Sequence, residues 1–294
     1  MTHIILCGCG RMGRALLSGW CADTGGLALD AITVIDPAFA IAKNKPDITP
    51  RNPRLSIAYY ADAKAIGDGA ALPASMPAVM PANIIVLATK PQDTAQAIAE
   101  VQAMADKSTT AWLSIAAGLS LAWLKQHIGT EQSSAIFRAM PNTPAAIGMG
   151  ITALACHAEA GGDSLTLAKH LLEVGGQVVV VEEKLMDAIT ATSGSGPAYV
   201  YALQEAMEAA AIELGIDVDL ARQLTIATIR GAAEMMAEID APPPAELRRH
   251  ISSPGGTTLA ALEVLADKSG QGGLDALMRR AMSAATKKAG TLGK

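Results

Sequence analysis

Short apolar runs alternate with segments of helical periodicity in the first half of the chain. Apolar runs of strand length separated by helical patterns are typical of βαβ units. The pattern predicts strands at Ile4–Cys7, Ala31–Ile35, Ile84–Ala88, Ala111–Ile115, Ala135–Arg138, Ile151–Ala155 and Val178–Glu182, and helices at Met12–Ala22, Thr94–Met104 and Leu121–His127. We therefore expect an α/β fold whose doubly wound sheet has helices on both faces.

Two segments of this half have no regular period. Lys43–Arg54 contains Pro46, Pro50 and Pro53, and Asp68–Asn83 is rich in Ala, Pro, Gly and Met. Proline and glycine interrupt helices and strands. We expect Asp68–Asn83 to be a surface insertion between two elements of the sheet.

Strand-like runs end at Glu183, and helical patterns rich in Ala and Leu follow. The paired carboxylates Glu182 and Glu183 are interpreted as a solvated strand end. Helices are predicted at Pro197–Leu214, Leu220–Ala237, Leu259–Ala266 and Leu274–Ala289, with Pro242–Pro244 as a break. This change from alternating strands and helices to helices alone predicts two domains, an α/β domain over 1–183 and an all-helical domain over 184–294.

Composition agrees with a two-domain globular chain. Half of the 294 residues (50%) are hydrophobic, and the formal net charge is −5. Charged residues of both signs are mixed, without the basic stripe or polybasic patch that nucleic acids and membrane surfaces attract. No apolar run is long enough to cross a bilayer. We expect neither a nucleic-acid partner nor a membrane partner.

The four cysteines are predicted to be reduced and buried. Cys7 and Cys9 flank one glycine, too closely for ordinary disulfide geometry, and no nearby His or Cys pair completes a metal set. Residues Met1–Gly10 lack the basic region and the long apolar run of a signal peptide. We therefore expect a cytoplasmic protein without a metal site.

A glycine pattern, G-x-G-x-x-G, joins the first predicted strand to the first predicted helix. There Gly8 permits a tight turn, Gly10 lets the backbone approach a pyrophosphate, and Gly13 allows close packing of helix on strand. The helix N-terminus offers free N–H groups to the phosphates. An ordinary glycine turn is the alternative. We favour a Rossmann-type dinucleotide site made by Gly8, Cys9, Gly10, Arg11, Met12 and Gly13.

Asp36 follows the second predicted strand, where a carboxylate can accept hydrogen bonds from the adenosine ribose hydroxyls. A 2′-phosphate would be repelled there, which favours NADH. Lys43, Lys45, Arg51 and Arg54 lie downstream and are either a solvated basic loop or partners for such a phosphate. The cofactor is therefore expected to be NADPH or NADH.

Five further blocks of the chain are similar to motifs of the pyrroline-5-carboxylate reductases, and they occur in the family's order. They are LATKPQ (Leu87–Gln92), SIAAG (Ser114–Gly118), RAMPNTP (Arg138–Pro144), DAIT with SGSGPAY (Asp187–Tyr199), and SPGGTT (Ser253–Thr258). The chain departs from the family in the length of Asp68–Asn83, in Gly270–Leu274 where Phe-Arg is usual, and in Asp36, where NADP-using members often carry a small or basic residue.

The resemblance implies NAD(P)H-dependent reduction of the cyclic imine 1-pyrroline-5-carboxylate to L-proline, the last step of proline biosynthesis. It also implies a Rossmann domain followed by a helical dimerisation domain, in a homodimer or a higher homo-oligomer. Reduction of a C=N bond needs a hydride on carbon and a proton on nitrogen. Because a protonated imine is already electrophilic, a strong general acid is less necessary than for a ketone.

The family's SPGGTT loop binds substrate, which implies the same for Ser253, Gly255, Gly256, Thr257 and Thr258. Exposed N–H groups, two threonine hydroxyls and the start of a helix form a suitable nest for a carboxylate. By resemblance, the Thr258 hydroxyl bonds the ring nitrogen and assists its protonation as the catalytic residue. The alternative is a Ser N-cap and a glycine turn that open a helix.

The remaining expected cofactor contacts follow predicted strands at one edge of the sheet. Asn142 is expected to orient the nicotinamide amide, or else to form an Asx-turn. Lys90 either bonds a ribose or substrate oxygen or caps a strand end. The other residues expected to line the nicotinamide and its ribose are Ala88, Thr89, Pro91, Ala116 and Ala117.

Three other functions compete with this one. A β-hydroxyacid or 6-phosphogluconate type of dehydrogenase needs a catalytic lysine on the first helix of the second domain, and Gly196–Leu214 contains none. Reduction of pyrroline-2-carboxylate or a piperideine carboxylate stays open, because pocket size decides it. A non-catalytic nucleotide-binding regulator is expected to have lost the Ser253–Thr258 loop, which is intact.

Overall fold

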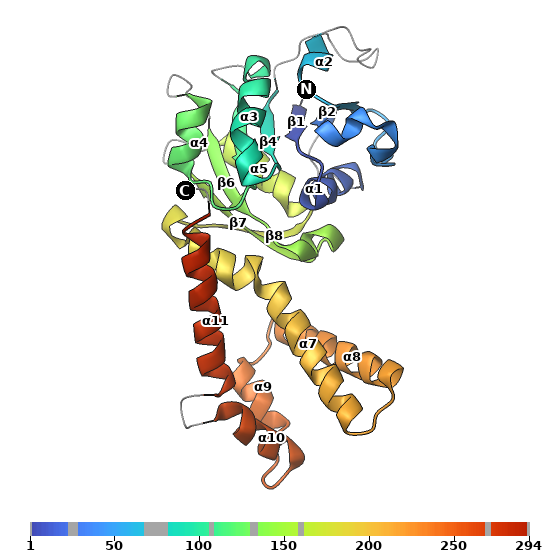
Figure 1. The fold of residues 1–294 in the computed structure, drawn as a ribbon, viewed down its shortest axis with the longest axis vertical. Coiled ribbons are helices and arrows are strands. Elements are labelled where there is room, and N and C mark those ends of the chain that lie inside the picture. The colour runs from blue at the N-terminus through green and yellow to red at the C-terminus, as the bar shows by residue number, and fades with distance from the viewer. Residues whose placement is uncertain are drawn as a thin grey trace. The chain divides into compact units, whose positions relative to one another are not determined.

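The computed structural model describes residues 2–22, 29–67, 82–105, 109–129, 135–157, 162–267 and 272–292. Nearly all of the predicted Asp68–Asn83 insertion lies outside these residues. The chain divides into two compact units. Met1–Gly194 with Ala285–Lys294 forms the sheet unit, and Ser195–Ala284 forms the helical unit (Figure 1).

One sheet organises the first unit. Within the described residues its strands are β1 (Thr2–Cys7), β2 (Leu29–Ile35), β3 (Ser56–Tyr60), β4 (Ile84–Leu87), β5 (Ala111–Ser114), β6 (Ile136–Met140), β7 (Gly150–Cys156) and β8 (Gly176–Val180). They lie in the order β3-β2-β1-β4-β5-β6-β7-β8, and the first six in that order are parallel. The order reverses between β1 and β4, and open α/β sheets bind ligands at such a switch point.

The last two strands run against the others. β7 is antiparallel to β6, and only Pro141–Met149, with the 3₁₀ helix η4 (Thr143–Ile147), connects them. A parallel pair needs a crossover of about a dozen residues or more, so this short connection turns the chain back. β8 is parallel to β7 because α5 (Asp163–Glu173) supplies a crossover. The doubly wound fold is therefore confirmed, with an antiparallel extension.

Helices cover both faces of the sheet, as predicted (Figure 1). Side chains alternate along each strand, so that Ile4 and Leu6 pack with α1 (Arg11–Ala22) and α5. Ile5 and Cys7 pack on the other face with α3 (Pro91–Val101) and α4 (Leu121–Ile128). The indole N–H of Trp20 donates to the carbonyl of Leu171 at 2.7 Å, which ties α1 to α5.

The helical unit contains α7 (Gly196–Glu213), α8 (Val218–Ala237), α9 (Pro244–His250), α10 (Thr257–Ala266) and most of α11 (Leu274–Ala289). α7 and α8 are joined by hydrogen bonds from Gln204 to Thr225 at 3.2 Å and from Arg222 to Glu208 at 3.0 Å.

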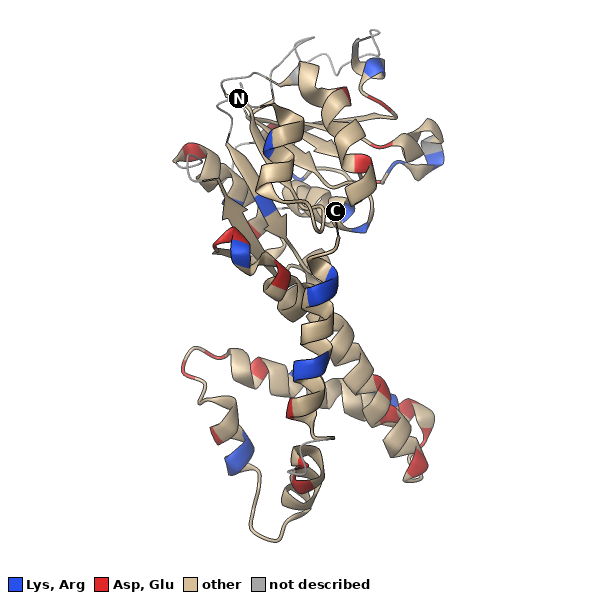
Figure 2. Cartoon of the chain, turned by 60° about the vertical axis from the view of Figure 1, so that its left-hand side comes forward, with Lys and Arg blue, Asp and Glu red and all other residues tan. Residues whose placement is uncertain are grey.

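Large apolar side chains on these helices are exposed, among them Tyr201 (60%) and Ile226 (51%). Several large apolar side chains exposed on two neighbouring helices favour an interaction face there. Acidic and basic residues are interspersed over both units (Figure 2). Among the described residues, no helix combines the length and the apolar character needed to span a membrane.

Candidate active site

The glycine turn after β1 has the geometry that its pattern predicts. Gly8 has a φ of +92°, and a Cβ there would lie 2.7 Å from the carbonyl oxygen of Ala88. A Cβ on Gly13 would overlap the carbonyl oxygen of Gly8, whereas a Cβ on Gly10 would have nothing within 4 Å. Gly8 is therefore required by its close contact with the backbone after β4, and Gly13 by its close contact with the backbone of Gly8. Gly10 leaves its side of the turn open to a ligand.

Asp36 links the end of β2 to this turn. Its Oδ2 accepts the backbone N–H of Cys9 at 2.6 Å, and its Oδ1 accepts that of Ala38 at 2.8 Å. Each carboxylate oxygen has a second lone pair, so the group can still accept hydrogen bonds from a ligand. The sequence indicated that Asp36 follows the strand, but not that it holds the turn.

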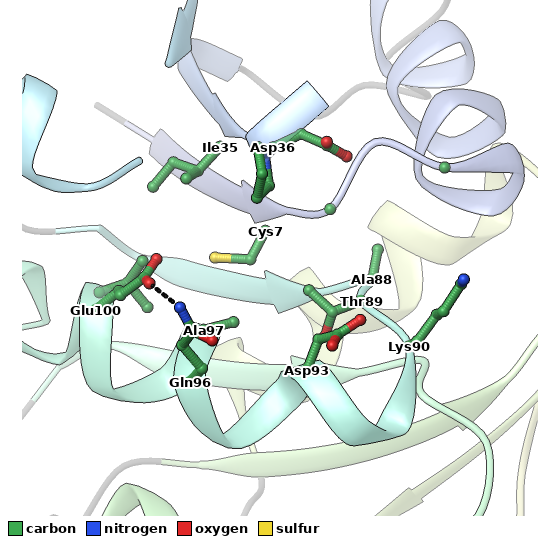
Figure 3. A pocket seen from close by; sticks show the side chains of 14 residues that line it. Cys7, Ile35, Asp36, Ala88, Thr89, Lys90, Asp93, Gln96, Ala97 and Glu100 are labelled. Carbon is green, nitrogen blue, oxygen red and sulfur yellow. Dashed lines mark hydrogen bonds between the residues drawn. The ribbon is translucent and has the colours of Figure 1, made fainter. Parts of the chain in front are cut away.

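A pocket of about 450 Å³ lies at the switch point beside these residues (Figure 3). It brings together six of the predicted cofactor residues: Gly8, Gly10, Asp36, Ala88, Thr89 and Lys90. Three residues of α3 that the sequence did not single out also line it, namely Asp93, Gln96 and Glu100. Gln96 donates to Glu100 at 2.8 Å. The lining is acidic, since Asp36, Asp93 and Glu100 outnumber Lys90.

Cys7 also lines this pocket. Burial, with a smaller effect from the charge of Glu100, raises the pKa of its thiol to about 12. The thiol is therefore neutral near pH 7, and only thiolates are good nucleophiles. Cys7 contributes apolar surface to the pocket rather than reactivity.

The other predicted cofactor residues lie near the pocket in sequence or along the same edge of the sheet. Pro91 opens α3 directly after Lys90. Ala116 and Ala117 lie in the turn between β5 and α4, where the Ser114 hydroxyl accepts the N–H of Ala116 at 3.2 Å. The pocket itself is not lined by Ala116, Ala117 or Asn142, nor by Cys9, Arg11, Met12, Gly13 or Pro91.

Asn142 is buried at the end of β6. Its Oδ1 accepts the N–H of Ile151 at 3.0 Å, and its Nδ2 donates to the carbonyl of Ser193 at 3.2 Å. The oxygen therefore bonds the N–H of Ile151 at the start of β7 rather than the N–H two residues on that an Asx-turn uses. The side chain fixes the connection between β6 and β7, and one N–H of its amide is left for another partner.

In the helical unit, Ser253–Thr258 forms a glycine turn at the start of α10. Gly255 has a φ of +72°, and the N–H of Gly256 donates to the carbonyl of Ser253 at 3.0 Å. Gly256 is the N-cap residue, and no side chain caps the helix. The Ser N-cap alternative is thus not observed. The first N–H groups of a helix have no intrahelical partner, so those of Thr257 and Thr258 remain available.

Comparison with known proteins gives one family. A family model described as pyrroline-5-carboxylate reductase dimerisation matches residues 183–292. Pyrroline-5-carboxylate reductase 2 of Bacillus subtilis (strain 168) is 40% identical over 185 residues, which cover 63% of this chain and 65% of that enzyme. Just under two thirds of its length is therefore matched.

Two longer matches agree. Pyrroline-5-carboxylate reductase of Mycobacterium leprae (strain TN) is 32% identical, with 97% of this chain and 95% of that enzyme covered. The solved structure of a pyrroline-5-carboxylate reductase from Coxiella burnetii is 29% identical, with a TM-score of 0.79, and covers 100% of this chain and 99% of that one. With the fold and the glycine turn described above, these matches show that the chain belongs to the pyrroline-5-carboxylate reductase family of oxidoreductases.

Proposed function

We propose that the protein reduces 1-pyrroline-5-carboxylate to L-proline with NADPH or NADH, the last step of proline biosynthesis. The observation that carries the proposal is the pocket at the β1/β4 switch point, beside a glycine turn shaped for a pyrophosphate. In a chain of this family, such a pocket supports use of a nicotinamide dinucleotide.

The residues of the sheet unit fit that cofactor. Gly8 and Gly13 hold a turn that no side chain could occupy, and Gly10 leaves room for the phosphates. In the proposal, Gly8, Cys9, Gly10, Arg11, Met12 and Gly13 bind the pyrophosphate, and Asp36 binds the adenosine ribose. Ala88, Thr89, Lys90, Pro91, Ala116 and Ala117 line the nicotinamide and its ribose, and Asn142 orients the nicotinamide amide. When bound, the cofactor supplies the hydride.

The substrate is assigned to the loop before α10. The N–H groups of Thr257 and Thr258 at the start of α10 and that of Gly255, with the hydroxyl of Ser253, bind the carboxylate of the imine acid, while Gly256 shapes the turn through its N–H bond to the carbonyl of Ser253. The hydroxyl of Thr258 hydrogen-bonds the ring nitrogen and assists its protonation while the ring carbon receives the hydride. Correct orientation of the two reactants supplies much of the rate enhancement.

We propose a homodimer or higher homo-oligomer with a cytoplasmic location. Support for assembly comes from the match of residues 183–292 to a dimerisation model and from the exposed apolar side chains of α7 and α8. The domain limits 1–183 and 184–294 stay a prediction.

Oxidation of NADH and NADPH with purified protein tests the reaction. Turnover of 1-pyrroline-5-carboxylate, with formation of proline, is expected to exceed turnover of pyrroline-2-carboxylate and piperideine carboxylate. Faster turnover of either alternative would reassign the substrate. Saturable nucleotide binding without turnover of any imine would identify a regulator instead.

A further inference from the structure

The turn between β5 and α4, residues 115–120, is held by parts of the chain distant in sequence. It follows β5 at the sheet edge that also carries the Gly8 turn and Ala88–Lys90. Under the proposed function, on which this inference rests, its Ala116 and Ala117 line the nicotinamide and its ribose. The position of the turn therefore affects how well the cofactor binds.

Glu183 holds the end of this turn. Its Oε1 accepts the backbone N–H of Leu121, the first residue of α4, at 2.7 Å. This N–H has no intrahelical partner, and a carboxylate at a helix N-terminus is also favoured by the helix dipole. Ser120 caps the same helix from within the turn by accepting the N–H of Trp123 at 3.0 Å.

The carboxylate of Glu183 is itself held in place by Arg138. Its side chain is 10% exposed, and its Nη1 donates to the same Oε1 of Glu183 at 3.1 Å. Its Nη2 lies 3.9 Å from Oδ1 of Asp187. A guanidinium buried to this degree is costly without a paired charge. The interpretation of Glu183 as a solvated strand end is therefore wrong, because its carboxylate joins β6 to the start of α4.

The C-terminal part of the sheet unit holds the middle of the turn. Gly118 has a φ of +84°, and a Cβ there would overlap the backbone carbonyl of Leu292. Leu292 is placed by a turn in which its N–H donates to the carbonyl of Ala289 at 3.0 Å. Asp187 lies beside this segment too, since a Cβ on Gly290 would be 3.2 Å from its Oδ2. All of these residues belong to the sheet unit.

We propose that Glu183 and Leu292 are positioning residues for the cofactor site. They fix the two ends of the segment Gly118–Leu121, and so set the place of Ala116 and Ala117. The chain leaves the sheet unit shortly after Glu183 and returns shortly before Leu292. Residues 183–292 are also the segment matched to the family's dimerisation model.

Glu183→Gln tests the first anchor. It keeps the size of the side chain and removes the charge that Arg138 and the helix N-terminus share. Glu182→Gln is the matched control, because this neighbouring carboxylate is 70% exposed and pairs with the similarly exposed Lys184. Removal of residues 292–294 tests the second anchor, and it keeps the proposal testable if Glu183→Gln does not fold.

Three measurements separate positioning from general stability. Fluorescence titration of the purified full-length variants with NADH and NADPH gives the dissociation constant. We expect it to rise about tenfold in Glu183→Gln, as for loss of one charge-assisted hydrogen bond. The KM for cofactor is expected to rise with it while kcat at saturation is unchanged. Hydrogen exchange is expected to accelerate at the amides of residues 116–121 and not in β1 or β4.

Unchanged cofactor affinity in both folded variants would overturn the proposal, as would exchange that accelerates equally across the whole sheet. An equal effect of Glu182→Gln would also overturn it. These outcomes are distinct from failure of the proposed function, which is shown by absence of imine reduction in the unmodified protein.

Discussion

The carboxylate of Asp36 accepts the backbone N–H of Cys9, with 2.6 Å between Oδ2 and the nitrogen. This bond fastens the end of β2 to the glycine turn after β1. It also fixes a negative charge in the pocket proposed for the adenosine ribose.

Because Asp93 and Glu100 add to this charge, we predict that the protein prefers NADH. The preference in kcat/KM is expected to be about tenfold or more, or roughly 1.4 kcal/mol. Asp36→Ser should reduce it, and should raise the affinity for adenosine 2′,5′-bisphosphate relative to AMP in calorimetry. Asp62→Ser, at an exposed aspartate outside this pocket, is the control. A strong NADPH preference of the unmodified protein would contradict the prediction.

Alanine substitutions at Gly8 and Gly10 are predicted to have different effects, the first on stability and the second on cofactor affinity. Gly8→Ala puts a Cβ against Ala88 at positive φ and is expected to lower the free energy of unfolding by about 1–3 kcal/mol. Gly10→Ala meets nothing within 4 Å, so thermal stability should be unchanged while cofactor affinity falls. Titration and thermal unfolding of both variants check this. Normal cofactor binding by Gly10→Ala would contradict the assignment of the pyrophosphate to this turn.

Thr258→Ala is expected to lower kcat/KM for the imine about 100-fold, the usual contribution of a group that assists proton transfer. Thr258→Ser keeps the hydroxyl and should recover most of the loss. Ser252→Ala is a control, because that hydroxyl donates to the carbonyl of Arg248 at 2.7 Å and not to a ligand. Equal rates for the alanine and serine variants would show that the hydroxyl has no role.

The thiols of Cys7, Cys9 and Cys21 are predicted to resist alkylation in the folded protein. Burial raises their pKa values to about 12, 11 and 11. A raised pKa keeps the neutral thiol up to that pH, so the reactive thiolate at pH 8 is about a thousandth of the total or less. Mass spectrometry after iodoacetamide treatment, with and without denaturant, checks this. Rapid labelling of Cys7 before unfolding would contradict its burial.

Ile226→Glu is predicted to weaken self-association. Ile226 is 51% exposed on α8, and a carboxylate in an apolar interface is left unpaired and desolvated. Light scattering should show a smaller species at low protein concentration, and Glu234→Gln on the same helix should not. An unmodified protein that is active as a monomer would contradict the assignment of this face.

Local patterns predicted most of the fold, because the buried strands of the sheet are short apolar runs and the helices that cover it each have one apolar face. β3 escaped, since Ser56–Tyr60 follows a proline-rich stretch and mixes polar with apolar positions. The helices α5 and α9 were not predicted either. α9 begins at the last of three consecutive prolines that were interpreted as a break. Proline fits the first turn of a helix as well as it ends one.

The site was predictable where one segment forms it, as in the Gly8 turn. Asp93, Gln96 and Glu100 were not identified, although their spacing places them on one face of α3. Only the packing of α3 beside β1 directs that face into the pocket. The bond from Leu121 to Glu183 joins residues 62 positions apart. No local pattern reports such a contact.

The return of the chain to the sheet unit after the helices has a consequence for synthesis. Ala285–Lys294 belongs to that unit, yet a ribosome makes it after Ser195–Ala284. Gly118 therefore cannot contact Leu292 until the helical unit has been synthesised. Nascent chains arrested before Leu292 should have a sheet in place and a nucleotide site still unfinished.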